Sequence, residues 1–265
     1  MKIDSTPLKE GQLPFDKEVV RKAALDLTES VESWKKGKLY KYTLDPENCT
    51  NDPKCEVQTY GQTIGGDYWL CRRSFHNINP ENYRKVVEVL NGSQWDASLE
   101  KWVMPDIAAR SKLEQEYIET LSKCHVVRQV TDDCDNDEFD NFGWVLVNLE
   151  YELGKPLTTR EFNEWVCPLI PTSKTGDNGS TVETSVVVSL VADEETRDPV
   201  HHTHAYYASV EQLKYDYSNH VLEWTMCTSS DAGGNVPKWI QNATIARTVA
   251  KDVPYLLGWM NKRGD

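Results

Sequence analysis

The segment that decides the fold runs Trp224-Thr-Met-Cys-Thr-Ser-Ser-Asp-Ala-Gly-Gly-Asn-Val-Pro-Lys-Trp-Ile-Gln-Asn242. It begins in a β-rich stretch over 219–228 and passes into a tight loop, where Gly233 and Gly234 can adopt positive φ. Pro237 suits the first turn of a helix because its φ is already near the helical value. Apolar residues then recur at helical spacing and predict a long C-terminal helix over 236–261. The segment therefore predicts a strand, a tight loop and a helix in direct succession.

Outward from this segment, the chain alternates between helical and strand patterns. Apolar residues at helical spacing predict an N-terminal helix over 16–36, and Asn79 with Pro80 marks the start of a helix over 80–91. A further helix is expected over 106–123. Short β-rich runs predict strands at 38–44, 54–62, 67–76, 124–131, 142–153, 182–192, 200–211 and 219–228.

This order of elements predicts an α+β fold. Antiparallel hairpins bury one face of a curved sheet, and the long last helix can close that concavity over an apolar cavity. No internal repeat and no linker-like stretch interrupts the order, so residues 1–265 are predicted to form a single domain.

Three landmarks carry a resemblance to the START lipid-transfer domains. Asp231, Gly233, Pro237, Trp239 and Asn242 match the D-x-G-G/x-x-x-P-x-W-x-x-N pattern at the family's last strand, Ω loop and C-terminal helix. Lys155-Pro-Leu-Thr-Thr-Arg-Glu-Phe162 is similar to its P-x-S-x-R-D-F segment, with Thr for Ser and Glu for Asp, and Gln94-Trp95-Asp96 to its W-D/N dipeptide. The resemblance is closest in style to divergent fungal START-like proteins. It implies a helix-grip (START/Bet v 1-like) fold that encloses one lipid and needs no cofactor.

Strand alternation over 67–76 leaves the orientation of one arginine open. If Trp69, Arg73 and Phe75 point inward, Arg73 is a buried cation that needs a carboxylate or a lipid phosphate as its partner. If they point outward, Arg73 lies on an exposed face of the sheet.

Strand 142–153 presents a consistent apolar face, with Asn148 and Glu150 on the opposite one. Together with the resemblance, these patterns predict as lipid-binding residues Trp69, Arg73, Phe75, Trp95, Val145, Val147, Leu149, Tyr151, Trp224, Trp239, Ala243 and Leu257.

A gate is expected at Asp231, Gly233, Gly234 and Pro237. The alternative is that these residues only cap and pack a helix. The arginine that the phosphatidylcholine-binding type carries before its W-D dipeptide has no counterpart in 91–95, so tight selectivity for phosphatidylcholine is not expected.

Composition narrows the classes of function. With 42 acidic against 29 basic residues, the net charge of -13 argues against a nucleic-acid partner and against general adhesion to an anionic membrane. The first fifteen residues contain no apolar run, and the longest apolar stretch, 186–192, is far too short to cross a bilayer. We therefore expect a cytoplasmic, monomeric protein that touches membranes only transiently. Its nine Trp and twelve Tyr suit a tunnel wall that meets both apolar and polar parts of a ligand.

Metal binding and catalysis have weak sequence support. His202 and His204 would share a strand face, and the acidic run over 132–140 alternates carboxylates, but no C-x-x-C, H-E-x-x-H or complete EF-hand loop is present. The seven cysteines are scattered and are expected to be reduced thiols. No G-x-S-x-G, Walker or dinucleotide-binding motif occurs.

The sequence thus predicts a non-enzymatic protein that binds one phospholipid or sterol-type lipid and transfers it between membranes through the gate. Membrane contact is expected at Lys238, Trp239, Lys251, Lys262 and Arg263. Two alternatives stay open: a cyclase- or hydrolase-like enzyme, which would place titratable groups with shifted pKa values in the cavity, and a ligand-sensing module.

Overall fold

The computed structural model describes residues 1–44, 50, 52–131, 140–152, 158–177, 179–234 and 238–263, and in the last helix the side chains of Gln241 and 244–260. Its main strands are β1 (Lys35–Thr43), β2 (Lys54–Ile64), β3 (Asp67–Asn77), β6 (Leu121–Thr131), β7 (Gly143–Tyr151), β8 (Thr159–Thr175), β9 (Thr181–Val191), β10 (His202–Asp216) and β11 (Val221–Asp231). Its helices are α1 (Lys17–Ser30), α2 (Pro80–Leu90), α3 (Ala109–Tyr117) and α4 (Lys238–Arg263), with short 3-10 turns at Glu10–Gln12 and Val31–Ser33.

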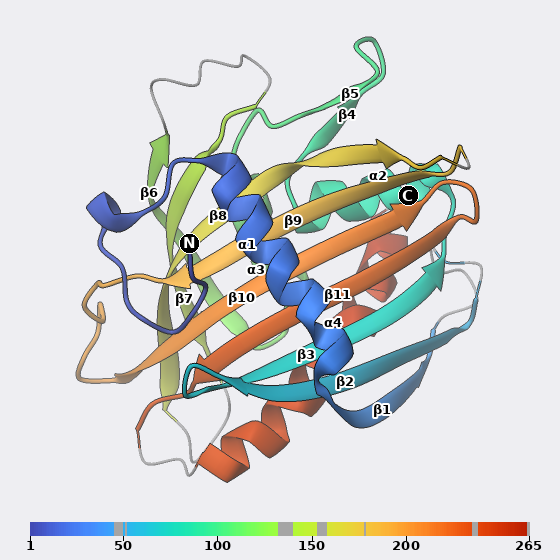
Figure 1. Ribbon diagram of the computed structural model, residues 1–265. Coiled ribbons are helices and arrows are strands. Elements are labelled where there is room, and N and C mark those ends of the chain that lie inside the picture. Colours follow the sequence, from blue (N-terminus) through green and yellow to red (C-terminus); the bar gives the residue numbers. More distant parts are fainter. Residues whose placement is uncertain are drawn as a thin grey trace.

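The main strands form one curved sheet in the order β1-β2-β3-β11-β10-β9-β8-β7-β6 (Figure 1). Neighbouring strands in this order pair antiparallel. Where β9 has ended, the first residues of β10 pair in parallel with β8, so that His202 lies opposite Thr159 and Ala205 opposite Phe162. A small separate hairpin, β4 (Gln94–Asp96) with β5 (Lys101–Val103), projects from the sheet. The predicted α+β class, with a large antiparallel sheet and a C-terminal helix, is confirmed.

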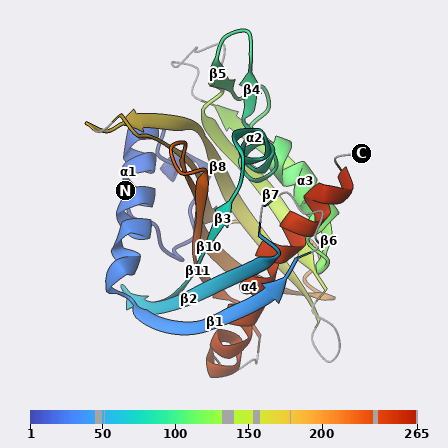
Figure 2. The same ribbon diagram turned by 90° about the vertical axis from the view of Figure 1, so that its right-hand side faces the viewer.

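Helix α1 covers one face of the sheet, and α2, α3 and α4 lie on the other (Figure 2). On the α1 face, Val20 and Ala24 of the helix join a buried cluster that includes four tryptophans: Trp34, Trp69, Trp144 and Trp165. The indole N–H groups of Trp144 and Trp165 donate to the carbonyl oxygens of Pro14 and Leu8, at 2.9 Å each. Buried indoles need such partners, so these two rings also hold the N-terminal segment on the sheet.

On the α4 face, the last helix is packed unevenly. Its second half supplies Val253, Leu256, Leu257 and Met260 to a large buried cluster with residues of α2, β10 and β11. Among the described side chains of its first half, Ala250 joins the same cluster, and Val249 packs with Leu70 and Met226. The described side chains of this half leave part of the sheet incompletely covered. Among the described helices, none is long and apolar enough to cross a membrane.

The helix boundaries differ from the sequence predictions in one main place. The N-terminal helix expected over 16–36 is α1 over 17–30, continued by a 3-10 turn, and the C-terminal helix expected over 236–261 is α4 over 238–263. The helix expected over 106–123 is only α3, over 109–117. It ends early because Leu121 already pairs with Tyr151 as the first residue of β6, and sheet pairing overrides the helical pattern there.

The sequence prediction omitted β8, the longest strand, along with the β4–β5 hairpin. Pro168 and Pro171 hid β8, because proline cannot donate to a sheet ladder and argues against a central strand. Both prolines lie beyond Val166, which forms the last pair with β7, so β8 is paired there only with β9. A register shift between Leu169 and Thr172 accommodates Pro171.

We expect Asn91→Ala to destabilise the fold. Asn91 is fully buried after α2, and its side-chain amide donates to the carbonyl oxygens of Leu169, at 3.0 Å, and Val186, at 3.1 Å. Removing the amide leaves two buried carbonyls without that donor, which should lower the free energy of unfolding by roughly 2–4 kcal/mol. Urea denaturation measures the change, with Glu88→Ala, an exposed position on the same helix, as the control. Equal losses for the two variants would contradict this role.

Candidate functional site

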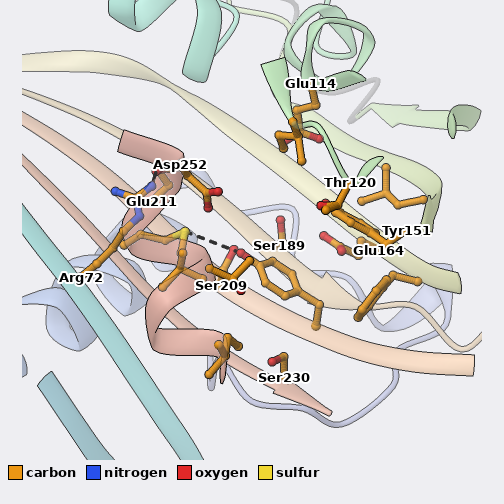
Figure 3. Close-up of a pocket in the computed structure, with 18 of the residues that line it drawn as sticks. Arg72, Glu114, Thr120, Tyr151, Glu164, Ser189, Ser209, Glu211, Ser230 and Asp252 are labelled. Atoms are coloured by element: carbon orange, nitrogen blue, oxygen red, sulfur yellow. Dashed lines mark hydrogen bonds and ion pairs between the residues drawn. The ribbon is translucent and has the colours of Figure 1, made fainter. Parts of the chain in front are cut away.

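The incompletely covered region encloses a cavity of about 310 Å³ between α4, α3 and the inner strands of the sheet (Figure 3). Its volume lies at the lower end of the roughly 300–1,000 Å³ found for ligand pockets. The strands contribute Arg72, Leu149, Tyr151, Phe162, Glu164, Val187, Ser189, Tyr207, Ser209, Glu211, Trp224, Met226 and Ser230 to its lining. The helices and connections contribute Leu90, Arg110, Glu114, Tyr117, Ile118, Thr120, Ala232, Gln241, Thr244, Ile245, Thr248, Val249, Asp252 and Leu256.

A row of aromatic rings forms part of the cavity wall. The ring of Tyr151 meets that of Phe162 edge to face at 5.4 Å between centroids, and Phe162 meets Tyr207 in the same way at 6.3 Å. Leu149 and Met226 extend this apolar surface. Rings in this arrangement pack favourably with one another and still offer an apolar surface to a ligand.

One side of the cavity carries a buried arginine on β3. Arg72 is 2% exposed, and its Nη2 donates to Oε1 of Glu211 at 2.7 Å. The indole N–H of Trp224 donates to the same oxygen at 2.6 Å. The Trp224 ring lies under the Arg72 guanidinium, with 4.5 Å between the ring centroid and Cζ of Arg72. Within the described part of the chain, Nε and Nη1 of Arg72 have no hydrogen-bond partner. Buried donors without partners cost free energy, so this side of the cavity suits a ligand that brings an acceptor oxygen.

The other side of the cavity holds a second ion pair and a carboxyl group on β8. Nη2 of Arg110 donates to Oε1 of Glu114 at 2.6 Å, and its Nε donates to the carbonyl oxygen of Leu90 at 2.7 Å. Glu164, 4% exposed, accepts a hydrogen bond from Ser189. Burial raises the pKa of Glu164 to about 8, with the charge of Glu114 adding to the shift. Glu164 is therefore largely protonated at neutral pH.

Asp252 enters the cavity from α4, the helix that covers it (Figure 3). Burial raises the pKa of Asp252 to about 7; Arg72 opposes the shift, and the charges of Glu211 and Glu114 add to it. No hydrogen bond to the Asp252 carboxyl is formed by any side chain in the described ranges. Near pH 7, about half of the protein molecules would therefore carry an ionised Asp252.

This charged lining was not predicted from the sequence. Glu164 lies on the strand that was not predicted. Asp252 carried a usable signal, because it stands in the apolar stripe of its helix, three residues after Val249 and four before Leu256. A carboxyl on a buried stripe needs a partner or a function.

Three of the predicted lipid-binding residues, Leu149, Tyr151 and Trp224, lie in the cavity wall. Val145 and Val147 point to the same side of β7, but they lie in a separate buried cluster with Met104, Ile107 and Ala108. They are therefore covered by protein.

The expected inward face of β3 is corrected by the structure. Trp69 packs in the cluster on the α1 face, and Phe75 is 60% exposed. Arg73 forms ion pairs with Glu32 and, at 3.1 Å, with Glu223. Because side chains alternate along a strand, Arg72 is the arginine that reaches the cavity.

The other predicted residues lie apart from the cavity or outside the described side chains. Trp95 is on the β4–β5 hairpin, where it contacts Trp102 edge to face at 5.5 Å and lies under the Arg84 guanidinium at 4.2 Å. Leu257 belongs to the large cluster under the second half of α4. The side chains of Trp239 and Ala243 are outside the described part of the structure.

The loop after β11 is held at three points. Gly233 and Gly234 have φ of 63° and 64°, and a Cβ on Gly233 would come within 2.1 Å of the carbonyl oxygen of His204. The backbone N–H of Gly233 donates to Oδ1 of Asp231 at 2.9 Å. The backbone of Ala232 accepts from Nε of Arg160 at 2.8 Å and donates to Oε1 of Gln241 at 2.9 Å. This loop, Asp231–Gly234, therefore connects β8 and β10 with α4; Pro237 lies outside the described residues.

The three nearby histidines have separate partners. Nδ1 of His202 lies 2.8 Å from Oε2 of the fully buried Glu161, whereas His201 pairs with Asp198 and His204 with Thr196. In the described ranges, no three His, Cys, Asp or Glu side chains are placed to hold a metal ion together. The possible calcium loop falls on residues 132–139, outside the described ones.

A second hollow of about 190 Å³ adjoins the cavity and shares with it Ile118, Thr120, Thr244, Thr248 and Asp252. It runs between α4 and the turn that joins α3 to β6, and its outer rim includes the exposed Arg247 and the half-buried Lys251. The cavity thus has a side that approaches solvent beside two basic residues.

Comparison with known proteins agrees with this architecture. Residues 69–260 match the family described as a protein of unknown function, DUF3074. No curated protein matches the chain. Among solved structures, human StAR-related lipid transfer protein 5 is similar over 92% of this chain and 100% of its own, with a TM-score of 0.54 and 9% identity. Human STARD10 is similar over 96% of this chain and 90% of its own, with a TM-score of 0.53 and 12% identity. At these identities the likeness shows the helix-grip fold.

We expect Asp252→Asn to stabilise the protein at neutral pH. An Asp side chain ionises near pH 4 in an unfolded chain, so the native state holds one extra proton between about pH 4 and 7, and wild-type stability falls as pH rises through that window. Asparagine carries no such penalty, so the variant should be more stable by roughly 1–2 kcal/mol above pH 7 and equal to wild type near pH 4.

Urea denaturation across this pH range measures the difference. Asp26→Asn, an exposed position on α1, is the control and should show no such trend. An advantage of Asp252→Asn that does not change with pH would contradict the buried carboxyl.

Proposed function

Since the chain belongs to the DUF3074 family and shares the helix-grip fold of START proteins, we propose that it binds one lipid in this cavity and transfers it between membranes. The observation that carries the proposal is the cavity itself, with apolar walls and charged groups at its sides. Taking apolar ligand surface out of water contributes roughly 25 cal/mol per Å², so binding requires no covalent chemistry.

The polar end of the lipid is held by the charged side chains. Arg72 offers unsatisfied donors to a phosphate oxygen or a sterol hydroxyl, and its ion pair with Glu211 fixes the guanidinium in place. The rings of Tyr151, Phe162 and Tyr207 meet the apolar part. A phospholipid or a sterol-type lipid fits this division of the lining.

Exchange of the lipid proceeds by opening the loop Asp231–Gly234 together with the first half of α4. Of the described side chains in that half, Ile245, Ala246 and Val249 form a small cluster with the sheet, and Gln241 accepts a hydrogen bond from the backbone of Ala232. Pro254 lies inside the helix and weakens it near the start of its well-packed half, because proline cannot donate to the carbonyl four residues back. The packed half can therefore stay in place while the first half moves.

Membrane contact is brief and local in this proposal. The net charge of -13 opposes general adhesion to anionic lipids, but Arg247 and Lys251 stand beside the hollow that adjoins the cavity. The side chains of Lys238, Trp239, Lys262 and Arg263, also proposed here, lie outside the described ones. We place the protein in the cytoplasm as a monomer of one domain, without a nucleic-acid partner.

A second candidate, an enzyme acting on a ligand in the same cavity, is favoured by one observation. Glu164 and Asp252 both line the cavity with raised pKa values, as acid–base catalysis requires. We rank the enzyme second for two reasons. Figure 3 shows Glu164 and Asp252 at different sides of the cavity. Burial also raises the pKa of the nearby Cys124 thiol to about 12, which disfavours this thiol as a nucleophile.

Native mass spectrometry of the purified protein should reveal a bound lipid at one molecule per chain. Ser209 lines the cavity and is 6% exposed, so Ser209→Phe should fill part of the space and reduce occupancy several-fold. Ser218→Phe, on the exposed turn after β10, is the control. Equal occupancy in both variants would contradict binding in this cavity, and a bound ligand whose mass changes on incubation would favour the enzyme.

Arg160→Met should speed lipid transfer between vesicles. The side chain of Arg160 holds the carbonyl of Ala232, so its removal frees the loop from β8 and should raise the transfer rate roughly three- to tenfold. Lys174→Met, exposed on the same strand, provides the control. Unchanged transfer by Arg160→Met, with lipid still bound, would remove this loop from the gate.

A further inference from the structure

The charges in the cavity do not balance. Its lining contains the carboxyl groups of Glu114, Glu164, Glu211 and Asp252 but only two guanidinium groups, those of Arg72 and Arg110. Each arginine already has a carboxylate: Arg72 pairs with Glu211 at 2.7 Å and Arg110 with Glu114 at 2.6 Å. Among the described residues, the carboxyl groups of Glu164 and Asp252 therefore have no ion-pair partner in the lining.

Asp252 is the one of these two that ionises more readily. Burial raises the pKa of Asp252 to about 7 and that of Glu164 to about 8, and Glu164 also has a hydrogen bond from Ser189. An incoming cation would lower the pKa of Asp252 and bring it into its ionised form at neutral pH. Glu164 would stay protonated and able to donate.

The groups that face Asp252 come from several elements. Arg72 on β3 is the cation near it, while Glu211 on β10 and Glu114 on α3 add negative charge. Tyr42 on β1, Tyr117 on α3 and Tyr151 on β7 also interact with it and have raised pKa values, so they stay neutral. The ion pairs Arg72–Glu211 and Arg110–Glu114 cancel, so ionised Asp252 is the unbalanced charge of the cavity lining, which repels an anion and attracts a cation.

Arg72 indicates that the polar end of the ligand also contains oxygen. Its side chain is 2% exposed, lines the cavity and, in the described part of the chain, leaves Nε and Nη1 without acceptors. A bare ammonium group would not satisfy these donors. An amino-alcohol or a phosphoethanolamine group supplies both the cation and the acceptor.

We propose that the bound lipid carries an ammonium group, which pairs with Asp252 beside an oxygen that accepts from Arg72. This inference rests on the proposed lipid-binding function and names the class of lipid. It assigns Asp252, the unpaired carboxyl on the helix that covers the cavity, as the residue that selects the ligand.

Three amphiphiles with the same chain test the charge preference: dodecylamine, dodecanol and dodecanoate. Competition with a fluorescent fatty alcohol at pH 7.5 should rank the amine tightest, roughly ten- to hundredfold tighter than the carboxylate. Because the ionised form of Asp252 binds the amine, affinity for dodecylamine should rise as pH increases from about 5.5 to 7.5, while that for dodecanol stays constant. Binding of all three with equal affinity would overturn the inference and leave the proposed function standing; no binding of any would reject the proposed function.

Variants separate the role of Asp252 from effects on folding. Asp252→Asn, expected to be the more stable protein, should lose the preference for the amine and its pH dependence while keeping its affinity for dodecanol. Glu164→Gln preserves a neutral, hydrogen-bonding side chain and should keep the preference, and so should the surface control Asp26→Asn. Retention of the amine preference by Asp252→Asn would overturn the assignment.

Two further ligands distinguish the sources of the amine. Sphingosine carries an amino-alcohol, and lysophosphatidylethanolamine carries an ammonium group with a phosphate. Tighter binding of either than of its N-acetylated form supports the ammonium, and the better of the two identifies the class. No loss of affinity on N-acetylation of either would contradict the proposal.

Discussion

One sheet with two apolar faces is the constraint on which the rest of the structure depends. Strands bury their two faces separately, so each face needs its own cover. Helix α1 closes one face over a cluster rich in tryptophan, and the indoles of Trp144 and Trp165 also fasten the N-terminal segment there. Helix α4 covers the other face together with α2 and α3, and most of its described buried side chains lie in its second half. The cavity is the part of that second face that α4 spans without filling.

The charged groups that line the cavity cost the protein stability. Arg72 leaves two buried donors without acceptors in the described part of the chain, and the burial of Asp252 and Glu164 disfavours their ionised forms. Residues chosen only for stability would be apolar at these positions. The large buried clusters on both faces of the sheet offset these costs. Local departures of this kind are expected where a protein binds something.

Elements with local sequence signals were predicted correctly. Features that depend on packing between distant parts of the chain were not. The loop and helix after β11 followed from glycine, proline and helical spacing within twenty residues. The orientation of β3 did not, because both alternating sets contain an aromatic residue and an arginine: Trp69 with Arg73, and Tyr68 with Arg72. What decides between them is α1, which packs on Trp69 from another part of the chain. Likewise, the position of Asp252 on an apolar stripe could be read from sequence, whereas its lack of a partner depends on β3, β8 and β10.

The segment similar to the START R-D-F motif shows how one strand can join several parts of the site. Alternation along β8 places Arg160 and Phe162 on one side and Glu161 on the other. Arg160 donates to the carbonyl of Ala232 in the loop, and Phe162 forms part of the cavity wall. Glu161 accepts from His202 and from the backbone N–H of Arg197, which fixes the connection between β9 and β10. Since Gly233 packs against the start of β10, a shift of β8 would reach the loop by two routes: directly through Arg160, and through β10. Arg160, Glu161 and Phe162 of β8 therefore couple the proposed gate to the cavity wall.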